Sequence, residues 1–112
     1  MHRSGTSAFT GSLKLFGIEL GTELLASQPD NPKGFFENRS VVALNDRILE
    51  ALQSSWDDMF ALPGDWVNHP ELAPLQKEVD AFLKTELKES SLFGIKDPRL
   101  CRLLPLWLDA FK

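Results

Sequence analysis

A short polar run at the start of the chain has the residue types of an anion-binding loop: Arg3, Ser4, Gly5, Thr6 and Ser7. Gly5 lets the backbone approach a ligand closely, and the hydroxyl groups of Thr6 and Ser7 can donate to phosphate oxygens. The planar guanidinium of Arg3 can hold two oxygens at once. A helix beginning directly after this run would add its unpaired N–H groups and its positive dipole end. The run therefore predicts a phosphate-binding loop, with an ordinary hydroxyl cap on a helix as the alternative.

Glu37 stands at a junction between a short apolar pair and a predicted helix, which Asn38 or Ser40 would cap. The commonest reason for a glutamate at such a position is the attraction between its carboxylate and the positive end of the helix dipole. From these residues alone, Glu37 is therefore interpreted as an acid that stabilises the start of a helix.

A cluster of charged residues, Lys96, Asp97 and Arg99, follows the short apolar run 92–95. A run of this length and composition is typical of a buried parallel strand. Open α/β sheets bind their ligands at the carboxyl ends of such strands, so the cluster predicts a ligand-binding edge. For Asp97 and Arg99, a salt link or a cap that holds the strand end is an equal alternative.

Four helices, each with apolar residues at helical spacing, are predicted over residues 7–16, about 40–52, 70–87 and 100–111. In the first of them, Phe9, Leu13 and Phe16 form the apolar face, and Gly17 follows as the C-cap. Pro105 predicts a kink or a short distorted turn in the last helix. The phosphate loop, Glu37 and the charged cluster therefore all adjoin helix ends.

Residues 54–69 are predicted to form a loop with three aromatic side chains that pack against the core: Trp56, Phe60 and Trp66. Asp57 and Asp58 in this loop have no histidine or third carboxylate at ligand spacing, so no metal site is expected there. His69 precedes a proline at a helix start and is expected to be a surface or capping residue.

The composition limits the classes of protein that the chain can belong to. At 112 residues, 43% of them hydrophobic, it is long enough for one domain with a modest core. Its formal net charge of -4 opposes a general attraction to nucleic acid or anionic membranes, so neither is expected as a partner. The single cysteine, Cys101, excludes an internal disulfide, and its apolar neighbours predict a buried thiol. Because no long apolar run and no signal-peptide core are found, a cytoplasmic location is expected.

Four blocks of the chain resemble the sequences of sulfotransferases, and they occur in the same order as in that family. Residues 2–7 are similar to the 5′-phosphosulfate-binding loop of that family, usually a basic residue followed by Ser-Gly-Thr-Thr or Ser-Gly-Thr-Ser. Residues 31–37, 54–58 and 96–101 resemble later blocks of bacterial sulfotransferase-like proteins, and the last is also similar to tyrosylprotein sulfotransferases. The resemblance implies a P-loop-like three-layer α/β fold, here as a helix-rich partial domain with few short parallel strands.

The same resemblance implies 3′-phosphoadenosine 5′-phosphosulfate (PAPS) as the co-substrate, from which an acceptor hydroxyl or amine takes the sulfuryl group without a metal ion. Such in-line transfer needs mostly positioning and charge neutralisation. Arg3, with residues 4–7, would hold the 5′-phosphate and draw charge from the bridging oxygen as the S–O bond breaks. Lys96 would reach the same oxygen as a cation or proton donor. Glu37 matches the position at which several family members carry a general base. The acceptor, whether small molecule, carbohydrate or peptide, and the oligomeric state stay open.

The chain departs from the family at both ends. In the family a buried strand precedes the phosphate loop, whereas only Met1 precedes His2 here. The family's arginine and serine that bind the 3′-phosphate of the donor would lie downstream of residue 112. We therefore expect residues 1–112 to be a partial sulfotransferase domain, which by itself binds PAPS weakly or not at all and transfers nothing.

Two other classes of protein are alternatives. A P-loop nucleotide kinase-like protein would carry Gly-x-x-x-x-Gly-Lys-Ser/Thr, but no lysine follows Gly5. A non-catalytic helical interaction module would have the same helical pattern without the chemistry. Binding of ATP with Mg²⁺ distinguishes the first alternative, and substitution of Arg3 and Lys96 distinguishes the second.

Overall fold

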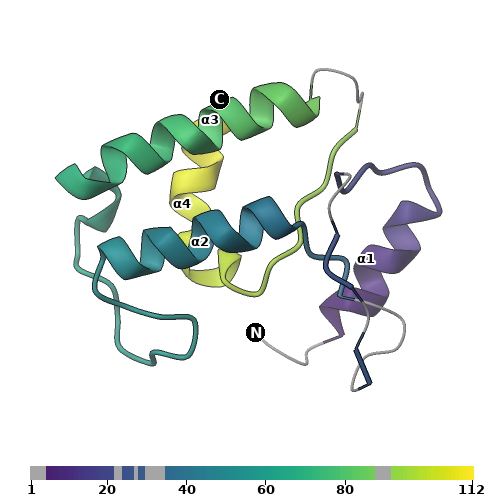
Figure 1. The fold of residues 1–112 in the computed structure, drawn as a ribbon, viewed down its shortest axis with the longest axis horizontal. Helices are drawn as coiled ribbons and strands as arrows, with labels where there is room; N and C mark the ends of the chain where they lie inside the picture. The colour runs from purple at the N-terminus through teal and green to yellow at the C-terminus, as the bar shows by residue number, and fades with distance from the viewer. Residues whose placement is uncertain (1–4, 22–23, 27, 30–34, 88–91) are drawn as a thin grey trace.

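The computed structural model describes residues 5–21, 24–26, 28–29, 35–87 and 92–112. Its α-helices are α1 (Thr6–Lys14), α2 (Arg39–Ala51), α3 (Ala73–Leu87) and α4 (Leu100–Ala110), and the 3₁₀ turns η1 (Trp66–Asn68) and η2 (Pro70–Leu72) precede α3. Figure 1 shows α2 and α3 side by side, with α4 crossing behind them and α1 apart at one end of the molecule. The sequence predictions of the three later helices are confirmed, and the last helix continues through Pro105.

The hydrophobic core lies between α2, η2, α3 and α4. Residues three and four apart along a helix share one face, and in α2, α3 and α4 most of the apolar residues with this spacing are buried. In α4, however, Leu104 and Phe111 have this spacing and are each 48% exposed. The buried apolar residues of this cluster are Val41, Leu44, Ile48, Leu49, Leu52, Leu72, Leu75, Val79, Leu83, Leu103, Leu106 and Trp107. The Phe82 ring lies edge-on to Trp107 and extends this core towards the segment around Phe93.

The predicted three-layer α/β fold is wrong, because the described residues form no sheet. The pairings in which both partners are described are isolated bridges, Glu19 with Phe93 in parallel and Leu24 with Asn38 in antiparallel orientation. The run 92–95 was predicted to be a buried strand, yet Leu92 is 54% exposed. A parallel sheet needs several neighbouring strands covered by helices on both faces, and here the apolar helix faces pack on one another instead.

The apolar face predicted for the first helix is also wrong. Phe9 and Phe16 are 67% and 81% exposed, whereas Thr10 is the buried residue of α1. Cys101 is exposed instead of buried. Of the three loop aromatics, Trp66 packs on the core as predicted, whereas Phe60 is 83% exposed. Phe9 and Phe16 follow helical spacing in the sequence, but α1 lies outside the group of helices that could cover them.

Asn38 joins the start of α2 to the segment after α1. Its side chain accepts hydrogen bonds from the N–H groups of Ser40 and Val41, which confirms the predicted N-cap, and its Nδ2 donates to the Leu20 carbonyl. Gly21 has a φ of 89°, and a Cβ there would meet the Asn38 side chain. This close approach fixes the position of Glu37, the residue immediately before the cap.

The side chain of Arg102 on α4 makes three hydrogen bonds to the loop between α2 and η1. Its guanidinium donates to the Ser55 carbonyl (2.9 Å), the Ser54 Oγ (3.1 Å) and the Phe60 carbonyl (2.8 Å). The loop also carries the exposed Met59, which is 97% accessible. The order of this loop therefore depends on Arg102 more than on apolar burial.

We expect Arg102→Ala to increase the rate of proteolytic cleavage within residues 54–60 while the thermal unfolding of the helices changes little. The reason is that the three accepting oxygens are exposed or half-buried and can bond water instead. Limited chymotrypsin digestion read by mass spectrometry, with circular dichroism on the same samples, measures both quantities. Arg39→Ala, an exposed arginine on α2, is the control, and equal cleavage of the two variants would contradict the role of Arg102.

Candidate functional site

The described part of the predicted phosphate loop is the start of α1. Gly5 is the N-cap of this helix with a φ of 82°, a backbone conformation that glycine adopts without strain. Ser7 Oγ donates to the Phe35 carbonyl at 3.3 Å, and Thr10 Oγ1 donates to the Thr6 carbonyl at 2.7 Å. The predicted loop residues Arg3 and Ser4 lie outside the described residues.

Two contacts dock α1 against the segment that carries Glu37. One is the hydrogen bond from Ser7 to Phe35, and the other is the approach of the Phe36 ring to Gly11, where an added Cβ would lie 2.9 Å from Phe36 Cζ. Phe36 itself has a φ of 57°, in a region that residues other than glycine rarely occupy. The chain therefore turns sharply at Phe36, just before Glu37 enters the interior.

Glu37 and Lys96, which are 59 residues apart in the sequence, form an ion pair. The Lys96 Nζ donates to the Glu37 Oε1 at 2.5 Å, and each side chain is only 9% exposed. Glu37 is fixed by the adjoining helix cap and by its carbonyl, which accepts from the Leu25 N–H at 2.8 Å. Lys96 is fixed by the segment 92–95, which pairs with Glu19 through Leu92 and Gly94. The interpretation of Glu37 as a helix-dipole acid did not anticipate this pairing.

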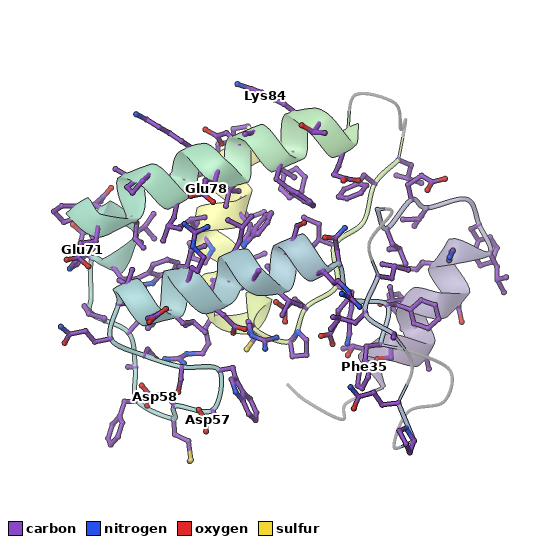
Figure 2. The ribbon with its side chains drawn as sticks, in the orientation of Figure 1. Phe35, Asp57, Asp58, Glu71, Glu78 and Lys84 are labelled. Carbon is purple, nitrogen blue, oxygen red and sulfur yellow. The ribbon has the colours of Figure 1, made fainter. Side chains whose placement is uncertain are left out.

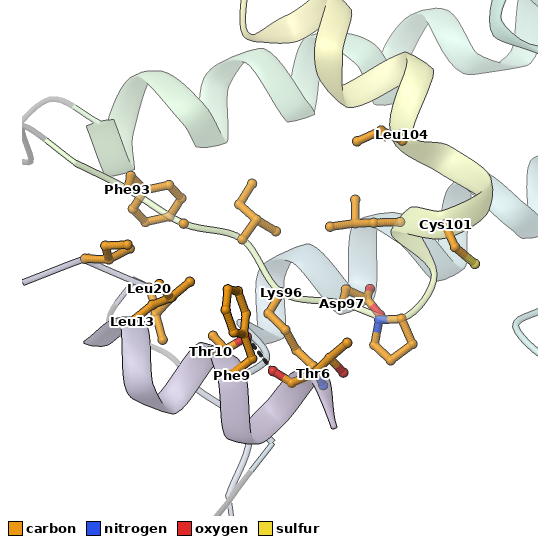
Figure 3. Close-up of a pocket in the computed structure, with 15 residues that line it drawn as sticks. Thr6, Phe9, Thr10, Leu13, Leu20, Phe93, Lys96, Asp97, Cys101 and Leu104 are labelled. Atoms are coloured by element: carbon orange, nitrogen blue, oxygen red, sulfur yellow. Dashed lines mark hydrogen bonds between the residues drawn. The ribbon is translucent and has the colours of Figure 1, made fainter. Parts of the chain in front are cut away.

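A cavity of about 440 Å³ lies between α1, the segments 18–20 and 93–98, and the start of α4. Figure 3 shows Thr6 and Phe9 of α1 on one side of it, and Lys96 and Asp97 on the strand-like segment opposite. Thr6 and Lys96 therefore line one cavity, although the sequence separates them by most of its length. Ser7 and Glu37 are not among its lining residues.

Asp97 belongs to a buried hydrogen-bond network that holds α4 to α2. Its Oδ2 accepts from Asn45 Nδ2 at 2.8 Å, and its Oδ1 accepts from the Arg99 N–H and from Arg99 Nη1 at 2.8 Å. The Asn45 Oδ1 accepts from Trp107 Nε1 at 2.7 Å. Asp97 and Arg99 therefore make the salt link and cap that formed one of the two alternatives for them.

Arg99 completes this network at the surface. Its Nε donates to Asp46 Oδ1 at 2.6 Å. Burial lowers the pKa of the Arg99 guanidinium, but the hydrogen bonds and charges of Asp97 and Asp46 outweigh that effect and raise the pKa above its ordinary value. Arg99 therefore stays charged and acts as a bridge between α2 and the turn before α4.

Asn45 is the residue of this region that sequence reasoning missed. It was not among the residues singled out in the sequence, yet its side chain is fully buried. The sequence does indicate its burial. Asn45 follows Val41 by four residues and precedes Ile48 by three, so it lies on the apolar face of the helix. A polar residue at such a position needs partners, which Asp97 and Trp107 supply.

The other polar residues singled out in the sequence lie away from the cavity. Figure 2 shows Asp57 and Asp58 on the loop at the far end of α2 from Phe35. Asp58 accepts from the Phe60 N–H and from Ser54 Oγ, and these hydrogen bonds lower the pKa of its carboxyl group. His69 caps η2 by accepting from the Glu71 N–H, as predicted. Among the described residues, no three potential metal ligands of the His, Cys, Asp or Glu type come together.

Comparisons of the chain with models of protein families, with curated proteins and with solved structures find no match. Within the described part of the chain, none of the helices has the length and apolar character needed to cross a membrane.

Proposed function

We propose that this chain belongs to a sulfotransferase, which binds PAPS and transfers its sulfuryl group to an acceptor hydroxyl or amine. The single observation that carries the proposal is the buried contact between Glu37 and Lys96. The resemblance assigns these two residues to the reacting centre from separate blocks of sequence. Their contact, beside a cavity that Thr6 also lines, is what a shared reaction site requires.

The pair can also explain how the site responds to its co-substrate. Without an anion nearby, the Lys96 ammonium and the Glu37 carboxylate compensate each other in a poorly hydrated place. A phosphosulfate group would compete with Glu37 for Lys96, because it offers several anionic oxygens to the same cation. Glu37 would then lose its ion pair with Lys96, and its carboxylate could accept the proton of the acceptor as the acceptor attacks.

The transfer step uses both residues. The acceptor oxygen or nitrogen attacks the sulfur and forms a new bond, while its proton passes to the Glu37 carboxylate. The bond between sulfur and the bridging oxygen breaks, and its electron pair stays on 3′-phosphoadenosine 5′-phosphate (PAP). Lys96, with the positive end of α1 and Arg3, would neutralise the charge that develops on that oxygen.

The proposal is tested by titrating the isotopically labelled chain with PAP and recording amide chemical shifts. We expect weak binding, with a dissociation constant of about 1 mM, and shifts centred on Gly5, Thr6, Ser7 and Lys96. ATP with Mg²⁺ should bind less well. Radiolabelled PAPS with a panel of acceptors should give no transfer by this chain alone, and measurable transfer would contradict that expectation.

A double variant, Glu37→Met with Lys96→Met, serves as the folded control that lacks both charges. Its affinity for PAP should fall at least about tenfold, because a hydrogen bond from a charged donor contributes about 1.5–3 kcal/mol. Lys84→Met, at an exposed position of α3, should leave the affinity unchanged. Tighter binding of ATP with Mg²⁺ would favour the kinase-like alternative, and the absence of localised shifts would favour the interaction module.

A further inference from the structure

Helix α4 is apolar on two opposite faces, and one of them is exposed. The residues that face the core are Leu103, Leu106 and Trp107. The outer face consists of exposed residues that lie three, four and three residues apart: Cys101, Leu104, Leu108 and Phe111. A helix that is apolar all round is normally covered all round. We propose that a second copy of this chain covers the outer face, with the two α4 helices antiparallel and related by a twofold axis.

The outer face is complementary to itself in an antiparallel pair. Alternating intervals of three and four residues place apolar side chains in one stripe, as in helices that pack side by side. When the twofold axis passes between Leu104 and Leu108, each of these leucines contacts the other one in the second copy. The same register places Phe111 of one copy opposite Cys101 of the other. A large side chain therefore meets a small one at both ends of the stripe.

The cavity gives the ring of Phe111 a space to enter. Cys101 and Leu104 lie at the edge of this cavity formed by α4, as Figure 3 shows, and its volume is about 440 Å³. A cavity of roughly 150 Å³ already holds a benzene molecule, so a phenyl ring fits this one. Because the pair is symmetric, each copy would fill the cavity of the other and replace water there by apolar contacts.

The charges beside the outer face favour the antiparallel arrangement. Arg102 and Asp109 directly follow Cys101 and Leu108, so both charges lie along one flank of α4. In the antiparallel pair the two flanks lie on the same side of the interface in opposite order, which brings Asp109 of one copy nearly level with Arg102 of the other. Opposite charges then meet twice at the rim. In a parallel pair the flanks lie on opposite sides of the interface and gain no such contact.

The exposed area is sufficient for a weak dimer. Leu104, Leu108 and Phe111 are 48%, 52% and 48% exposed. Phe9, on the α1 wall of the cavity, is 67% exposed. At roughly 100 Å² for each of these side chains and less for Cys101, two copies would bury about 1,000 Å², which is where specific interfaces begin. We therefore expect a dissociation constant on the order of 10 µM.

Sedimentation equilibrium of the chain, from well below to well above this concentration, tests the proposal. We expect a reversible equilibrium between monomer and dimer. Leu108→Glu should raise the dissociation constant at least about 100-fold, because it places an unpaired carboxylate from each copy in the interface. Leu15→Glu is the control, since Leu15 is 87% exposed and does not line the cavity, and it should leave the constant unchanged. A monomer at every concentration, or equal effects of the two substitutions, would overturn the proposal.

Disulfide trapping tests the direction of the helices. Under mild oxidation, Phe111→Cys should become linked to Cys101 of the other copy, as read by peptide mapping. The natural chain should not become linked, because its two Cys101 residues would lie about 15 Å apart along the helices. A disulfide needs a Cα separation of about 4.4–6.8 Å. Leu15→Cys is the control that should also stay unlinked, and a disulfide in the natural chain would show a parallel pair and overturn the antiparallel one.

The dimer does not depend on the proposed function, and the two are read separately. A chain that stays monomeric but shows the PAP-induced shifts would refute the dimer alone. A dimer that shows no PAP-induced shifts would refute the sulfotransferase proposal alone. Circular dichroism of each variant checks that the helices are retained, so that a lost dimer is not mistaken for a lost fold.

Discussion

Lys96→Met should lower the free energy of unfolding by about 3–5 kcal/mol, because it leaves the Glu37 carboxylate buried without its partner. The lysine side chain is only 9% exposed, so water cannot readily replace the ammonium. A loss of this size is a large part of the 5–15 kcal/mol that typical domains possess. Urea denaturation followed by circular dichroism measures it directly.

Two further variants distinguish the free-energy cost of leaving a charge buried without a partner from the cost of losing an ion-pair contact. The double variant Glu37→Met with Lys96→Met should recover most of the stability, since replacing both members of a buried pair by apolar residues is often neutral. Arg47 and Glu78 form a pair of the same 2.5 Å length, but their side chains are 52% and 46% exposed. Arg47→Met should therefore have a much smaller effect, and equal losses for Arg47→Met and Lys96→Met would contradict the burial argument.

Local patterns in the sequence predict the later helices well. The apolar positions of α2, such as Val41 and Ile48, recur at helical spacing, and an asparagine at the boundary supplies the cap. These signals act over a few residues and agree with the burial that follows, so local and global preferences coincide. The same reasoning correctly selected His69 as a cap.

Non-local features escape this kind of reasoning. A short apolar run such as 92–95 has the same sequence pattern whether it forms the central strand of a sheet or an isolated bridge. Which of the two it forms depends on whether other strands lie beside it. The face of α1 likewise depends on which helices cover it, so the periodicity of Phe9 and Phe16 was misleading. The sequence located Glu37 and Lys96 separately, but their contact needs three-dimensional information.

Asn45→Leu should destabilise the protein by roughly 2–6 kcal/mol, although it adds an apolar side chain to a core. The substitution leaves the Trp107 indole N–H and the Asp97 Oδ2 without the partners that now lie 2.7 and 2.8 Å away. Each buried polar group without a hydrogen bond costs about 1–3 kcal/mol. The near-ultraviolet circular dichroism of the tryptophans should change as well, because Trp107 is only 1% exposed.

The comparison for this prediction is Asn68→Leu, which removes an exposed hydrogen bond to Asp65 of the same 2.8 Å length. That variant should stay within about 0.5 kcal/mol of the natural protein, since water can bond both groups. Asn45→Asp adds a sharper test, because it places a carboxylate against Asp97 in the core and should destabilise more at neutral than at acidic pH. If Asn45→Leu proved as stable as Asn68→Leu, the network would not be what holds α4 against α2 and supports the turn that carries Lys96.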